Sequence, residues 1–101
     1  LIDETVPTTV LCPKDGVFEK TLSNIQEIRA RGGRILTITT SDGVERLTPH
    51  AQDIIGIPKT IEPLQPILSV IPLQLMAYAI AVARGHNPDR PRNLAKSVTV
   101  E

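Results

Sequence analysis

The pattern of apolar and polar positions predicts three strands and two helices. Three stretches are short and rich in apolar or β-branched residues, and they lie next to Pro, Gly or Asp, which is typical of buried strands. They are residues 7–12, 34–40 and 53–58. Between the first two, apolar residues recur every three or four positions, as on one face of an amphipathic helix. These residues are Phe18, Leu22, Ile25 and Ile28, and Gly32 and Gly33 follow them as a stop signal. A strand, a helix and a strand at this spacing predict a βαβ unit with parallel strands.

The second helix is predicted from a long apolar segment, Leu64 to Arg84. A membrane-spanning helix needs about 20 predominantly apolar residues. Pro66 and Pro72 fall within the segment, however, and proline in a helix interior removes a hydrogen bond. We therefore expect a buried helix that is kinked or restarted at Pro72. Because it is apolar on all sides, we expect other subdomains or another subunit to cover it.

The composition narrows the class of protein. The chain has 101 residues, the size of one small domain, with one Phe, one Tyr and no Trp. The core is therefore aliphatic, which suits a buried parallel sheet covered by helices. Eleven Lys and Arg balance eleven Asp and Glu, so the charge gives no indication of nucleic acid or of an anionic membrane surface. We expect no nucleic-acid partner and no membrane association.

Candidate chemistry is sparse along most of the chain. Cys12 ends an apolar run and is the only cysteine, so we interpret it as an inert structural thiol in a reducing compartment. No metal-ligand spacing and no Gly-rich phosphate motif is present, so we expect no metal and no cofactor. The hydroxyl-rich run from Thr37 to Ser41 could bind phosphate, but threonine is also a good strand former, and we assign the run to the strand.

The segment at residues 86–101 carries the one candidate nucleophile, Lys96. Leu94, Val98 and Val100 indicate that this segment docks onto a surface. A lysine held in a docked apolar segment loses water, which lowers its pKa and exposes a neutral amine for attack on a carbonyl. The residue chemistry alone still favours an ordinary surface lysine at this position.

The last eleven residues resemble the C-terminal signature of the isomerising glutamine–fructose-6-phosphate aminotransferases. They read Pro-Arg-Asn-Leu-Ala-Lys-Ser-Val-Thr-Val-Glu, from Pro91 to Glu101. Residues 72–78 and 29–33 resemble late helices of the same family at matching distances, and the likeness extends along the whole chain. The chain does not begin with Met, and its first two residues, Leu1 and Ile2, read as part of an apolar run. We therefore expect it to be a piece of a longer protein.

The resemblance implies a three-layer α/β/α sugar-isomerase (SIS) domain of the flavodoxin-like kind, with a parallel sheet. Residues 1–85 would form the C-terminal portion of the second SIS subdomain, and residues 86–101 would form a C-terminal active-site tail. The longer protein would also carry a glutaminase domain, form a homodimer through its SIS domains, and be cytoplasmic.

The resemblance also implies a reaction. In the family, the lysine that matches Lys96 opens fructose 6-phosphate and forms a Schiff base with its C2 carbonyl. Ammonia from glutamine then replaces the lysine, and a proton shift between C1 and C2 gives glucosamine 6-phosphate. The backbone at Ala95 is expected to contact the sugar. The family's phosphate-binding loop, glutamate base and ring-opening histidine lie upstream of Leu1, so we expect this piece alone to be inactive.

Two other classes of protein stay open from the sequence. The first is an SIS-type glucosamine-6-phosphate deaminase, which has no glutaminase domain; an N-terminal cysteine nucleophile in the parent gene would exclude it. The second is a non-catalytic SIS module that binds sugar phosphates. The presence of Lys96 argues against this second class.

Overall fold

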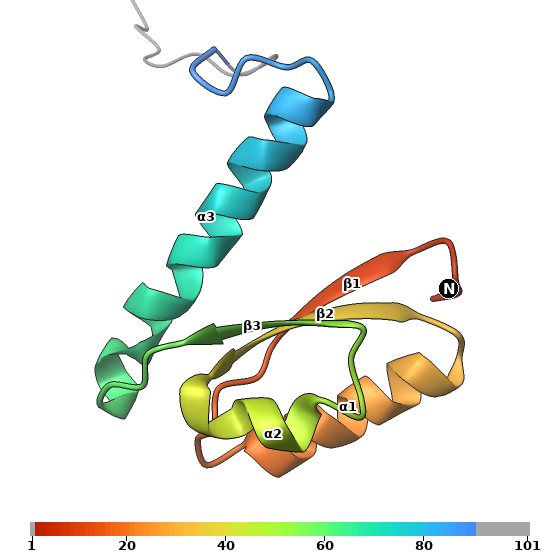
Figure 1. The fold of residues 1–101 in the computed structure, drawn as a ribbon, viewed down its shortest axis with the longest axis vertical. Helices are drawn as coiled ribbons and strands as arrows, with labels where there is room; N and C mark the ends of the chain where they lie inside the picture. Colours follow the sequence, from red (N-terminus) through yellow and green to blue (C-terminus); the bar gives the residue numbers. More distant parts are fainter. Residues whose placement is uncertain (1, 91–101) are drawn as a thin grey trace, which may run out of the picture.

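The structure, a computed structural model, describes residues 2–90 and is built on a parallel three-stranded sheet (Figure 1). The strands are β1 (Pro7–Leu11), β2 (Arg34–Thr40) and β3 (Asp53–Ile57), in the order β1-β2-β3. Thr9 pairs with Leu36, and Ile38 pairs with Ile55, in parallel register. The three strands and the parallel βαβ unit predicted from the sequence are confirmed.

One face of the sheet is covered by α1 (Phe18–Ala30) and the short helix α2 (Val44–Leu47). Both helices lie on the same side of the sheet in Figure 1. The core lies between them and the strands, and it is almost wholly aliphatic. It consists of Cys12, Phe18, Leu22, Ile25, Ile35 and Leu47. Full burial of a side chain such as Ile25 contributes about 1.5–3 kcal/mol, so the predicted apolar face is what holds α1 on the sheet.

The chain returns from β2 to β3 through a compact crossover. A 3-10 turn, η1 (Ser41–Gly43), leads directly into the four residues of α2, and a loop then reaches β3. This connection, residues 41–52, is short for a full crossover helix. The strands nevertheless pair in parallel, because one helical turn and a loop suffice to bring the chain back to the start of the sheet.

The second long helix, α3 (Gln65–Ala83), follows a 3-10 turn, η2 (Glu62–Leu64), and extends away from the sheet (Figure 1). It runs through Pro72 as one element, so the prediction of a restart there is wrong. The turns on either side of the proline keep the helical path although the proline itself has no N–H to donate. The helix is also not buried within the described chain: Leu75 is 65% exposed and Tyr78 is 58% exposed.

Among residues 2–90, the segment Glu62–Ala83 is one helix long and apolar enough to cross a membrane, judged by length and composition alone. The buried core helix of a soluble protein meets the same criterion, but few residues of this segment are buried within the described chain. The buried residues of α3 are Gln65 and Ser69, in its first two turns. Most of its large apolar side chains are exposed in the described chain.

Candidate functional site

The two site residues predicted from the sequence, Lys96 and Ala95, lie outside the described residues. Their roles therefore stay predictions, and the geometry around them is not part of the site described below. The boundary at residue 86 between the SIS portion and the active-site tail also stays a prediction, although residue 86 itself is described. The structure does describe the edge of the sheet at which the three parallel strands end.

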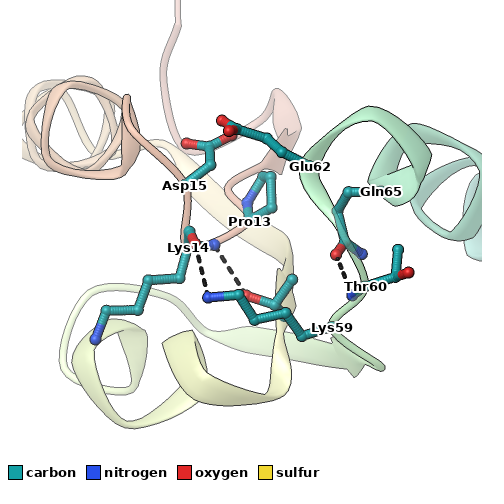
Figure 2. A pocket seen from close by; sticks show the side chains of 8 residues that line it. Pro13, Lys14, Asp15, Lys59, Thr60, Glu62 and Gln65 are labelled. Carbon is teal, nitrogen blue, oxygen red and sulfur yellow. Dashed lines mark hydrogen bonds between the residues drawn. The ribbon is translucent and has the colours of Figure 1, made fainter.

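A cavity of about 160 Å³ lies at the carboxyl ends of the three strands (Figure 2). Ligands of open α/β sheets bind at this edge, because the loops that follow the strands gather there. The lining residues come from the β1–α1 loop, the end of β2 and the connection from β3 to α3. They are Pro13, Lys14, Asp15, Thr40, Lys59, Thr60, Glu62 and Gln65.

Four residues at this edge form a hydrogen-bonded group, which we call the strand-end network: Lys14, Thr40, Asp42 and Lys59. The hydroxyl of Thr40 accepts a hydrogen bond from the backbone N–H of Lys14, at 2.9 Å, and donates one to Asp42 Oδ1, at 2.6 Å. The hydroxyl therefore joins the loop after β1 to the turn after β2.

Lys59 closes the strand-end network from the side of β3. Its ammonium donates to Asp42 Oδ2, at 2.6 Å, and to the backbone carbonyl of Lys14, at 3.3 Å. The hydrogen bond from Lys59, together with the one from Thr40, lowers the pKa of Asp42 below its ordinary value. The hydroxyl of Thr40, the carboxylate of Asp42 and the ammonium of Lys59 thus tie the three strand ends together.

Gln65, the first residue of α3, fixes the turn that follows β3. Its side chain is 6% exposed, Oε1 accepts a hydrogen bond from the N–H of Thr60, at 2.9 Å, and Nε2 donates to the carbonyl of Pro58, at 3.1 Å. Sequence reasoning treated Gln65 only as an interruption of the apolar segment. The available signal for its role was a lone amide at the start of an apolar helix. A buried amide needs hydrogen-bond partners for both its oxygen and its nitrogen.

The charges around the cavity are mixed, with two lysines, Lys14 and Lys59, and two acids, Asp15 and Glu62. In Figure 2 the carboxylates of Asp15 and Glu62 lie together, and the side chain of Lys14 extends away from them. The Asp15 carboxylate accepts the backbone N–H of Val17, the residue before α1, at 2.9 Å, and no side chain caps the helix itself.

The other candidates from the sequence are structural. Thr37 donates its hydroxyl hydrogen bond to the carbonyl of Val10, at 3.0 Å, so the hydroxyl-rich run belongs to β2, as predicted. Cys12 is fully buried, and burial raises the pKa of its thiol to about 11, with smaller contributions from Asp15 and Glu19. A thiol held neutral in this way is not a nucleophile. Within the described part of the chain, no group of three or more His, Cys, Asp or Glu could hold a metal ion.

The relatives found by sequence comparison share one name. No family model matches the chain. A glutamine–fructose-6-phosphate aminotransferase [isomerizing] from Thermus thermophilus is 57% identical over all 101 residues, which are 17% of its length. The proteins of the same name from Aquifex aeolicus and Gluconobacter oxydans are 52% and 50% identical over the same 101 residues, again 17% of each. The chain therefore spans about a sixth of the length of these curated relatives.

The backbone agrees with the sequence comparison. The C-terminal domain of glucosamine-fructose-6-phosphate aminotransferase from Francisella tularensis matches with a TM-score of 0.82 and 30% identity, over 88% of this chain and 25% of that one. The parallel sheet with its helices is thus part of an α/β domain of the sugar-isomerase (SIS) class. Within that class, the chain is similar along its whole length to isomerising glutamine–fructose-6-phosphate aminotransferases, and its backbone matches part of the C-terminal domain of one such enzyme.

Proposed function

We propose that the full-length protein containing this chain converts fructose 6-phosphate and glutamine into glucosamine 6-phosphate and glutamate, the first step of hexosamine biosynthesis. The observation that carries the proposal is 57% identity over all 101 residues to a relative named for this reaction. The alignment spans the whole chain, so it includes residues 86–101, in which Lys96 lies. The proposal assigns a glutaminase domain to the same parent protein as the source of ammonia.

Lys96 is the residue that reacts in this proposal. Its amine attacks the C2 carbonyl of the opened sugar and water leaves, which gives a protonated Schiff base; ammonia then displaces the lysine. Only the neutral amine attacks, and a free lysine with a pKa near 10.4 is neutral in about one molecule in 2,500 at pH 7. A tail that docks and excludes water lowers the pKa and raises this fraction. The backbone of Ala95, beside it, contacts the sugar.

The remaining parts of the site belong to other segments of the parent protein in this proposal. The cavity at the strand ends supports this division, because Asp42 holds the ammonium of Lys59, one of the two lysines that line it. A sugar phosphate would meet two further carboxylates there, those of Asp15 and Glu62. The phosphate cradle and the general base therefore come from upstream, and the isolated chain has no turnover.

The apolar surface of α3 supports a homodimer, or a contact with another SIS subdomain, as the functional form. Seven large apolar side chains of this helix are at least 40% exposed in the chain alone. They are Ile67, Val70, Ile71, Leu75, Tyr78, Ile80 and Val82. An apolar surface of this extent marks a contact with protein or with a membrane. We propose that association of SIS domains covers it, and not a membrane.

The experiment that tests the function measures glucosamine 6-phosphate formed by the purified full-length protein from fructose 6-phosphate and glutamine. Lys96→Arg should abolish product formation, because a guanidinium cannot form the Schiff base. Lys20→Arg, on the exposed side of α1, is the matched control and should keep full activity. Release of ammonia from glucosamine 6-phosphate, without any glutamine-dependent synthesis, would instead identify a deaminase.

A further inference from the structure

We draw no further inference here: the strongest candidate, the apolar groove between the end of β1 and the start of α3, which Leu11, Pro66 and Ser69 line, carries nothing, because nothing in the described part of the chain shows what covers it.

Discussion

Gly43, at the end of η1, lies directly against the hydroxyl of Thr39 in β2, so closely that a side chain at position 43 would overlap with it. The backbone of Gly43 is in an ordinary conformation, with a φ of −100°, so glycine is required here for space and not for its conformational freedom. The Thr39 hydroxyl is fully buried and has no hydrogen-bond partner within residues 2–90. This contact leads to two predictions about stability.

The first concerns Thr39. A buried hydroxyl without a partner loses its hydration and gains nothing in return, so Thr39→Val should raise the free energy of unfolding by about 1 kcal/mol. For a domain of this class that is an increase of about 2–4 °C in melting temperature, measured by calorimetry on the full-length protein. Thr37→Val is the matched control and should lower stability, because the Thr37 hydroxyl donates to the carbonyl of Val10. Equal losses in both variants would contradict the prediction.

The second concerns Gly43. A methyl group there would overlap with Thr39 and come within 3.3 Å of the ring of Phe18, so Gly43→Ala should cost about 1–3 kcal/mol. Gly16→Ala is the matched control, because a methyl group at position 16 meets nothing within 4 Å. It should be neutral or slightly stabilising. Adding Thr39→Ala to Gly43→Ala should recover part of the loss, and no recovery would show that the strain lies elsewhere.

The third prediction is a pH dependence that arises from Asp42. Its pKa in the folded protein is lowered from 3.8 by the hydrogen bonds from Lys59 and Thr40. A carboxylate of this kind contributes stability at pH values above its unfolded pKa, and that contribution is lost as the pH falls through the lowered pKa. The melting temperature of the wild type should therefore exceed that of Asp42→Asn at pH 6, and the difference should shrink below pH 4. A difference that is constant from pH 6 to pH 3 would contradict the assignment.

The fourth prediction concerns the outer surface of α3. Leu75 is 65% exposed in the described chain, and we expect another SIS subdomain or a second subunit to cover it in the full-length protein. Leu75→Glu would place an unpaired charge in that contact, so it should lower the melting temperature or dissociate the oligomer, as measured by calorimetry and light scattering. Lys20→Glu, on the solvent side of α1, is the control and should be tolerated. Unchanged stability and assembly in Leu75→Glu would mean that this surface is free.

The sequence predicted the elements whose side chains alternate or recur regularly between core and solvent. The periodic residues of α1, such as Leu22 and Ile25, are buried as expected because local spacing alone decides which face they occupy. For α3 the sequence left open a kink or a restart at Pro72, and the structure excludes the restart, because the turns on either side of the proline keep the helical path. The strand-end network was not predicted either. Lys59 and Lys14 are distant in sequence, and only the parallel register brings them together.

Part of the candidate site was predicted from the sequence, and part was found only in the structure. Lys96 and Ala95 were predicted from the family's terminal segment, in which residue type and position together indicate the chemistry. The hydrogen bonds of the Gln65 side chain could come only from the structure, because a glutamine in an apolar segment has no characteristic spacing. Its partners are two backbone groups in the preceding turn, at Pro58 and Thr60. A sequence does not indicate which backbone groups a side chain will bind.

The central claim is that Lys96 forms the Schiff base with the sugar. The most direct measurement is reduction of the full-length protein with borohydride in the presence of fructose 6-phosphate, followed by peptide mass spectrometry. We expect one sugar phosphate per chain, on the peptide that contains Lys96, and none in Lys96→Arg. A sugar phosphate on a different lysine, in a Lys96→Arg protein that still makes glucosamine 6-phosphate, would contradict the account.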